Sequence, residues 1–312
     1  MTRTALFSRS QPGGVWTISD LAAHPGDIWF VDSGCAQGAD SVGAGQSPDA
    51  AFLTLDYAIG RCTANNGDVI YVMPGHAETF TAANGFDVDV AGVKIIGLGW
   101  GDSRPTFTFG HANASVTVGA AGVWLENLRF NAGITAVLIG LSVETLSHGL
   151  TIKNCEWYWG GTTTWDFVDM VSIATPCDRV TFEGCRFLAE PAVAGSATGI
   201  KFVGPCSNMR VLGCEFMGDY STACLNSITA LSQGLMFLNN IVHNADADEP
   251  YLEVFAGTTG VIANTRGLAK AATVAANAVA NAMVHAENFV ANTAGTIPVI
   301  YGAAGVPALD VD

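Results

Sequence analysis

The chain has 312 residues, of which 49% are hydrophobic, 13% are charged and 36 are glycine. An ordinary soluble domain has ~25% charged residues, and the high apolar content of this chain excludes intrinsic disorder. With 13 Lys and Arg against 28 Asp and Glu, the net charge is −15, which would repel phosphate backbones and anionic lipid headgroups, so neither nucleic acid nor a membrane is an expected partner.

The mean hydropathy is +0.33, yet no segment is long enough to cross a membrane. The longest nearly apolar stretch, residues 132–143, falls short of the ~20 residues that a spanning helix needs. The first residues lack the continuous apolar core of a secretory signal. We therefore expect synthesis in a cytoplasm, where cysteines stay reduced.

An arm, a strand and a helix are expected before the internal repeat begins. Residues 1–26 are expected to form an N-terminal arm, and a first strand begins at Asp27 with the sequence DIWFVDSG. One helix is predicted over about residues 49–64, after a Ser-Pro-Asp start signal. Its apolar residues recur at helical spacing, at Phe52, Leu55, Ala58 and Ile59. An amphipathic helix there would cover the open end of a stacked β structure.

An internal repeat occupies most of the remaining chain. Segments such as VKIIGLGW, LTIKNCEW and VTFEGCRF share two alternating apolar positions, then Asn or Gly, then a further apolar residue. Taking the sixth residue of each copy as a marker gives the following column, with steps of 23 to 30 residues: Leu98, Leu128, Cys155, Cys185, Cys214, Asn240, Thr265 and Asn288. Three residues before each marker stands a residue that is buried if the segment is a strand.

The residue just before each marker indicates a bend. Seven of the eight are Gly or Asn, the residues that tolerate the left-handed backbone conformation, and the eighth is Glu287. Short strands that recur with bends bury their apolar faces only by stacking. The repeat therefore predicts an all-β fold, a single parallel β-helix over residues 27–302 with about eight to ten coils and a tail at 303–312. A β-sandwich is the alternative fold, but it does not explain a column of Asn and Gly in register.

The last part of this range is ambiguous. Residues 267–296 are rich in alanine, which favours helix, whereas the column match and the later TIPVIY favour strands. We interpret this part as a loop, one degraded coil and a closing strand.

The N-terminal half also carries a resemblance. The stretch VDSGCAQGADSVGAGQSPDAAFLTLDYAIGRCTANNGDVIYVMPGHAETF, followed by VKIIGLGWGDSRPTFTF, resembles the opening of pectate-lyase-like β-helix proteins, especially those of tailed bacteriophages. The general pattern of the resemblance extends over residues 26–302, and its most specific part is residues 32–105. It implies a right-handed β-helix and, for the phage members, a trimeric virion protein. The basic triad with an acidic metal cluster of pectate lyases is missing, as are the galacturonan-hydrolase motifs.

Cysteines invite a metal-site interpretation that the repeat makes unnecessary. Cys177, Cys185, Cys206 and Cys214 form two C-x7-C pairs, which a four-thiolate zinc site could use. The repeat instead places them in two ladders of small buried residues. We expect structural thiols and no cofactor.

Carboxylates near aromatic residues are the candidates for chemistry, because β-helix enzymes cut polysaccharides with carboxyl groups. Glu190 and Asp219 each lie five residues after a marker and could project from adjacent coils, and Asp166 and Asp169 could join them. Rings that could stack on a glycan or contact another subunit are Trp157, Tyr158, Trp159, Trp165 and Tyr220. The alternative is that these acidic residues are merely solvated.

A calcium site is a weaker hypothesis. Asp246, Asp248 and Glu249 stand close together in HNADADEP, but the Gly and terminal Glu of a calcium-binding loop are absent.

These observations favour a structural virion protein without enzymatic activity, a homotrimeric capsid decoration or head-spike protein that contacts the major capsid protein or other virion proteins. The alternative is a tail-spike receptor-binding protein or polysaccharide depolymerase that recognises a host surface glycan.

Overall fold

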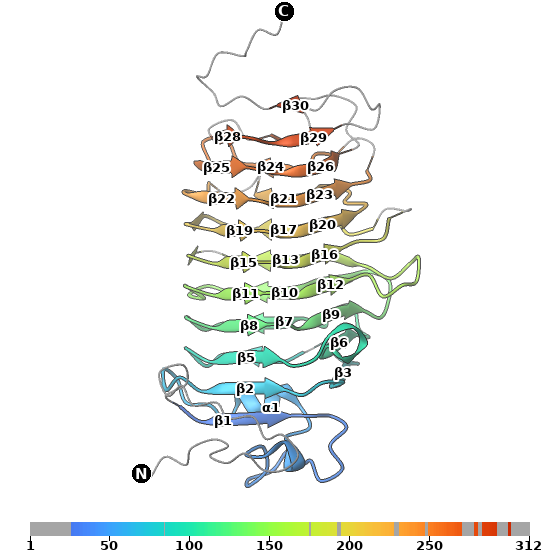
Figure 1. Cartoon of the computed structure of the whole chain (residues 1–312), viewed down its shortest axis with the longest axis vertical. Coiled ribbons are helices and arrows are strands. Elements are labelled where there is room, and N and C mark those ends of the chain that lie inside the picture. Colours follow the sequence, from blue (N-terminus) through green and yellow to red (C-terminus); the bar gives the residue numbers. More distant parts are fainter. Residues whose placement is uncertain are drawn as a thin grey trace, which may run out of the picture.

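The computed structural model of this chain is an elongated parallel β-helix (Figure 1). It describes residues 26–83, 85–174, 176–191, 195–227, 231–246, 249–269, 278–279, 283–291 and 299–300. The predicted arm at 1–26, except Gly26, and the tail at 303–312 lie outside this range. Each coil runs from sheet A through sheet B to sheet C, so that strands far apart in the sequence lie side by side.

Sheet A carries the strands that the repeat predicted. Its order is β1 (Ile28–Val31), β2 (Val69–Val72), β5 (Lys94–Gly97), β8 (Trp124–Glu126), β11 (Thr151–Lys153), β15 (Thr181–Glu183), β19 (Arg210–Leu212), β22 (Leu235–Leu238), β25 (Gly260–Ala263) and β28 (Val284–Ala286). The predicted inward column is confirmed in register from Ile95 through Leu125 and Ile152 to His285.

Sheet B begins directly after the bend that follows sheet A. Its order is β3 (Ala77–Phe80), β6 (Thr106–Phe109), β9 (Arg129–Ala132), β12 (Glu156–Tyr158), β16 (Arg186–Leu188), β20 (Glu215–Gly218), β23 (Ile241–Asn244), β26 (Arg266–Ala269), β29 (Phe289–Ala291) and β30 (Val299–Ile300). The last strand is antiparallel to β29, which is the closing strand expected from TIPVIY.

Sheet C completes each coil. Its order, read from the N-terminal end, is β4 (Asp87–Val88), β7 (Val116–Val118), β10 (Val137–Val143), β13 (Phe167–Ile173), β17 (Thr198–Phe202), β21 (Ala223–Ser227), β24 (Leu252–Val254) and β27 (Ala278–Val279). A short pair, β14 (Cys177–Asp178) and β18 (Cys206–Ser207), links two coils between sheets C and A.

The bends between sheets A and B adopt the predicted left-handed conformation in seven of the eight copies, and Gly97 of the first copy does not. Asn127, Asn154, Asn239 and Asn264 have φ angles between 51° and 58°, and Glu287 shares this conformation with φ 52°. The asparagine side chains bridge coils, since Asn264 Nδ2 donates to Asn239 Oδ1 at 2.7 Å. Bulkier residues pay a steric penalty in this conformation, which explains why the repeat uses Asn and Gly here.

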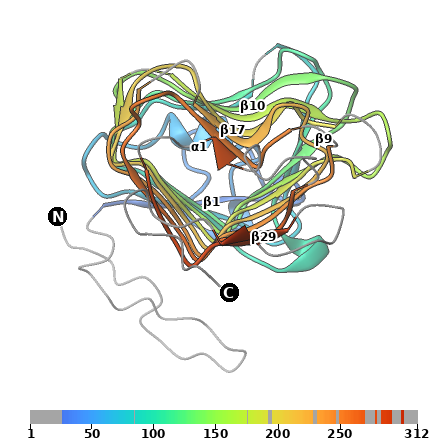
Figure 2. The same cartoon turned by 90° about the horizontal axis from the view of Figure 1, so that it is seen from above.

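The core is a stack of aromatic rings along sheet B. Phe130, Trp157, Phe187 and Phe216 lie on successive coils, with ring centroids 5.1, 4.8 and 4.6 Å apart. The view along the axis shows the three sheets around this interior (Figure 2). Each ring fills the layer above its neighbour, so the core grows by one layer per coil.

The predicted helix over 49–64 is largely wrong. Here the structure has a 3-10 turn, η1 (Pro48–Ala50), and a short helix, α1 (Leu55–Ile59), which buries Leu55, Ala58 and Ile59. Ala51 and Thr54 have extended backbones instead, and Phe52 pairs with Val31 of β1. Tertiary pairing with a strand therefore overrides the helical spacing. Among the residues described, no helix is long and apolar enough to cross a membrane.

His76 and its neighbours belong to the framework. The Ser33 N–H donates to His76 Nδ1 at 2.9 Å, so Nε2 carries the proton that faces Glu78 Oε1 at 2.8 Å. The same Glu78 oxygen accepts from the Leu55 N–H at the start of α1. Through these hydrogen bonds the PGHAET motif links β3 to the loop after β1 and to α1.

Candidate functional site

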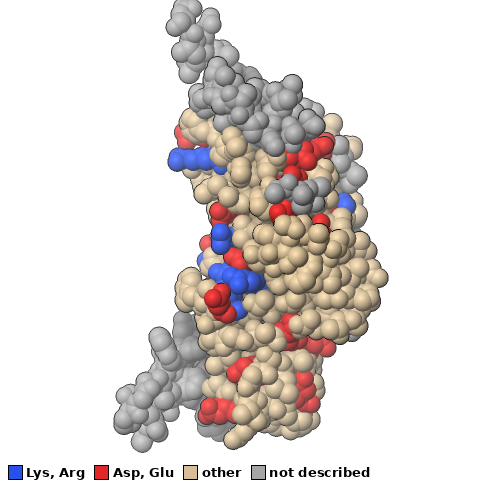
Figure 3. Space-filling view, turned by 90° about the vertical axis from the view of Figure 1, so that its right-hand side faces the viewer, with Lys and Arg blue, Asp and Glu red and all other residues tan. Residues whose placement is uncertain are grey.

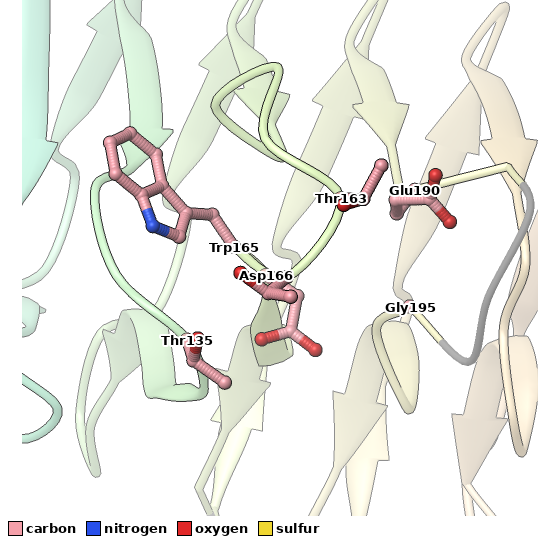
Figure 4. A pocket seen from close by; sticks show the side chains of 7 residues that line it. Thr135, Thr163, Trp165, Asp166, Glu190 and Gly195 are labelled. Carbon is pink, nitrogen blue, oxygen red and sulfur yellow. The ribbon is translucent and has the colours of Figure 1, made fainter.

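The loops that lead from sheet B into sheet C form the candidate site. They stand out beside β9 and β12 in Figures 1 and 2. A pocket of about 390 Å³ lies among them. It is lined by residues from three consecutive coils, namely Thr135, Thr163, Thr164, Trp165, Asp166, Glu190 and Gly195 (Figure 4). Three of the residues predicted from the sequence, Trp165, Asp166 and Glu190, are therefore brought to one pocket.

Asp166 is held by the loop of the preceding coil. Its Oδ1 accepts from the Ala136 N–H at 2.6 Å, and its carbonyl accepts from the Val137 N–H at 3.0 Å. Ala136 has a left-handed φ of 57°, an uncommon conformation for a residue with a side chain, and this directs its N–H at the carboxylate. Burial raises the pKa of Asp166 above its usual value, while the hydrogen bond from Ala136 opposes that shift.

Glu190 forms another wall of the pocket. It follows β16 and is only 3% exposed. Its carbonyl accepts from the Asp219 N–H at 2.9 Å. Gly195 packs close by, since a β-carbon there would lie 2.8 Å from the Asp219 carbonyl oxygen. Figure 4 shows the Asp166 carboxyl beside Thr135 and Glu190 beside Thr163, with the two carboxyl groups pointing in different directions.

The proposed partnership of Glu190 with Asp219 is only partly realised. The two residues do lie on adjacent coils and their backbones are hydrogen-bonded, but Asp219 does not line the pocket. Asp169 is also outside it: this residue of β13 is 6% exposed, accepts from the Thr198 hydroxyl at 2.6 Å and pairs with Lys201 Nζ at 2.8 Å. Asp166 is the carboxylate that shares the pocket with Glu190.

Two of the five predicted ligand-binding rings are instead core residues. Trp157 is fully buried and stacks between Phe130 and Phe187. Tyr220 is also fully buried, and its hydroxyl donates to the Phe187 carbonyl at 2.6 Å. Neither ring reaches the surface, because period-two alternation turns Trp157 inward and Tyr220 follows its strand into the interior.

The other three rings are partly buried. Trp165 lines the pocket, and Gly160 lies beneath it, since a β-carbon at that glycine would come 2.8 Å from the indole ring. Tyr158 and Trp159 pack on each other with centroids 5.7 Å apart, outside the lining of the pocket.

In the described part of the chain, no group of three or more His, Cys, Asp or Glu side chains is placed to hold a metal ion. Asp246 is half-buried and its N–H donates to Asn244 Oδ1, Glu249 contacts Asn244 through its carbonyl, and Asp248 lies outside the described residues. Burial raises the pKa of Cys155 and Cys206 to about 12, as the structural interpretation of these thiols requires.

The sequence analysis missed the threonines of the pocket and the ion pair of Asp169 with Lys201. The run of three threonines at 162–164 just before Trp165 was a visible signal of a polar loop. The ion pair gave no signal in the sequence, because its two residues are 32 positions apart and meet only when β13 pairs with β17.

Comparison with known proteins finds solved structures with a similar fold but no matching family. No family model and no curated protein matches the sequence. One similar solved structure is a rhamnogalacturonan lyase, with 14% identity, a TM-score of 0.48, and coverage of 78% of this chain and 74% of that chain. Another is the pectate lyase Pel9A, with 12% identity, a TM-score of 0.46, and coverage of 82% and 79%.

Both are named as lyases. This finding contradicts the expectation from the sequence that the chain has no enzymatic activity, and we do not retain that expectation. At this similarity the likeness concerns the parallel β-helix fold, so the substrates of the two lyases are not assigned to this chain.

Proposed function

We propose that the chain binds a polysaccharide on the loops between sheets B and C and cleaves it with Asp166 and Glu190. The observation that carries the proposal is the pocket they share with Trp165 and three threonines. Carboxyl pairs hydrolyse glycosidic bonds, aromatic rings stack on sugars, and hydroxyl groups form hydrogen bonds with them.

Asp166 is the general acid in this proposal. Because burial raises its pKa, Asp166 keeps its proton to a higher pH than an ordinary aspartate and can donate it to the glycosidic oxygen as the bond breaks. Glu190 then accepts a proton from the water that attacks the sugar. The carboxyl groups stand at different walls of the pocket and point in different directions (Figure 4), and the sugar and the attacking water would lie between them.

The test is cleavage of a polysaccharide panel by the purified chain. Release of reducing ends is measured with dextran, galactomannan, alginate and polygalacturonate. Wild type is expected to cleave at least one, and Asp166→Asn and Glu190→Gln are expected to lose about 100-fold or more in rate. The matched control is Glu183→Gln, which changes an exposed carboxyl on sheet A. The proposal is wrong if wild type cleaves none of these polymers, or if both site variants cleave as fast as the control.

A structural role in a phage particle is the second candidate. It is favoured by apolar side chains that project outward from the last coils, where Met236, Ile241, Val284 and Phe289 are 39 to 52% exposed. An apolar surface of this kind fits contact with a further copy of the chain. Assembly and cleavage are compatible, because these residues lie on the outer faces of sheets A and B, away from the pocket.

A further inference from the structure

Trp100 is the most exposed large aromatic side chain in the described part of the molecule. It is 83% exposed, whereas the next aromatic, Phe289, is 44% exposed. Because a tryptophan ring has a large apolar area, an exposed one offers a large contact surface to a ligand. The segment around it, GLGWGDSRP, belongs to the most specific part of the family resemblance, and the pocket of Asp166 does not use it.

The backbone that carries Trp100 is held from several sides. Asn127 Nδ2 donates to the carbonyls of Gly97 and Gly99 at 2.8 and 3.0 Å. On the other side begins the 3-10 turn η2 (Gly101–Ser103), the teal helical turn beside β6 in Figure 1, and the Gly75 N–H donates to its Ser103 carbonyl at 2.7 Å. The exposed ring therefore sits on a fixed support, which lowers the entropy cost of binding.

A shallow pocket of about 240 Å³ lies beside the ring. It is lined by Ile96, Gly97, Leu98, Gly99, Trp100, Glu126, Asn127 and Asn154. Glu126 is held in place, because the Trp124 indole N–H donates to its Oε2 at 2.9 Å. An aromatic plate next to fixed carboxylate and amide groups offers both the apolar and the hydrogen-bonding partners that a sugar ring needs.

The charge of this pocket favours uncharged sugars over anionic ones. Glu126 is the only charged side chain in its lining, and the whole chain carries a net charge of −15. An anionic sugar would be repelled, while the hydroxyl groups of a neutral sugar can donate to a carboxylate.

We propose that Trp100, with Glu126 and Asn154, forms a binding subsite for an uncharged sugar residue of a polysaccharide. The subsite lies at the bend between sheets A and B, whereas the Asp166 pocket lies on the loops between sheets B and C. It holds the polymer at a second point on the molecule. The choice of a polysaccharide as ligand rests on the proposed function, but binding at Trp100 does not require cleavage.

Affinity electrophoresis in gels that contain dextran or galactomannan tests the subsite. Wild type is expected to be retarded by at least one of these neutral polymers, and Trp100→Ala is expected to weaken the apparent Kd about tenfold, the loss of one aromatic contact. The control is Leu138→Ala, which shortens another exposed side chain, 49% exposed on β10. Thermal unfolding should be unchanged in Trp100→Ala, because this side chain lies largely in solvent, and little changed in Leu138→Ala, whose side chain is half exposed.

The outcomes separate the two proposals. If the Asp166→Asn variant no longer cleaves the polymer but is still retarded in the gel, binding at Trp100 does not depend on catalysis. If Trp100→Ala is retarded like wild type, or wild type is retarded by neither neutral polymer, the subsite is wrong whatever the cleavage assay shows. The same comparison is made in gels that contain polygalacturonate, an anionic polymer. If Trp100→Ala loses as much retardation there as in the neutral polymers, the proposal that the ligand is uncharged is wrong.

Discussion

Asp166 shows how one side chain acquires properties that its residue type alone does not give. The carboxylate is partly withdrawn from water at the start of β13, and it keeps a single strong backbone donor, Ala136, from the preceding coil. Withdrawal from water raises its pKa more than this donor lowers it. Its protonation state therefore depends on the loop of a neighbouring coil.

The raised pKa of Asp166 predicts a stability change with a definite sign. The folded chain holds the Asp166 proton more tightly than the unfolded chain, so this contribution is complete below the ordinary aspartate pKa and is lost as pH rises through the raised value. Asp166→Asn cannot ionise and keeps an oxygen for the Ala136 N–H. We expect its thermal unfolding midpoint to exceed that of wild type at pH 7, with the difference vanishing near pH 3. A larger advantage at pH 3 than at pH 7 would contradict the shift.

At the scale of the element, an outward ladder of alternating charge joins the strands of sheet B. Arg129, Glu156, Arg186 and Glu215 occupy equivalent positions on successive strands, and adjacent members pair at 2.7, 3.0 and 2.7 Å. Arg104 adds a third guanidinium to Glu156 at 3.5 Å. Figure 3 shows Lys or Arg atoms and Asp or Glu atoms side by side on the middle part of one face of the molecule. Opposite charges directly opposite each other favour this register between neighbouring strands.

The buried carboxylate in this ladder should be costly to remove. Glu156 is 4% exposed, and Glu156→Ala would leave three arginine side chains facing one another. We expect a loss of about 1.5 to 3 kcal/mol in unfolding free energy, the range for hydrogen bonds to charged groups, measured by chemical denaturation. Glu183→Ala breaks the exposed pair with Lys153 and should leave the stability almost unchanged. Equal effects of the two substitutions would show that burial of Glu156 does not matter.

Over the whole molecule, the stacked coils produce an interior that is closed to solvent along most of its length. Six of the eight cysteines are buried in it, and none of the eight forms a disulfide. Cys35 and Cys62 are less buried, and burial together with Asp68 raises the pKa of Cys62 to about 12.

Thiol reactivity should therefore report on the integrity of the entire solenoid. In the native state at pH 8 we expect a thiol-specific dye to label Cys35 readily and Cys62 slowly, because Cys62 has almost no thiolate. The other six should react only after unfolding in guanidinium. Labelling counted by mass spectrometry checks this, and rapid native labelling of Cys185 or Cys214 would contradict the buried ladder.

The outer surface predicts self-association. Ile241 of β23 is 52% exposed, and Phe289 of β29 is 44% exposed in the same register, with Arg266 of β26 between them. The second candidate function, a phage structural protein, implies a trimer in size-exclusion chromatography with light scattering. If this surface forms the contact, Ile241→Asp should shift the chain to monomer, because an unpaired charge cannot be buried at low cost. Leu138→Ala on sheet C serves as the control. A monomeric wild type would remove the support for assembly through this surface.

The sequence by itself determined the parallel β-helix. Its repeat made the inward column of sheet A and the Asn and Gly bends readable, because stacking puts the same requirement on the same position of every coil. The site could be predicted only in part: Trp165, Asp166 and Glu190 were identified, but Trp157 and Tyr220 were misplaced outside the core. The loops of the site do not repeat, so no column reveals which side chain turns inward. Only the tertiary structure decided that Asp166 rather than Asp219 faces the pocket with Glu190, that Lys201 pairs with Asp169, and that Trp100 stays in solvent, because these outcomes depend on contacts between coils.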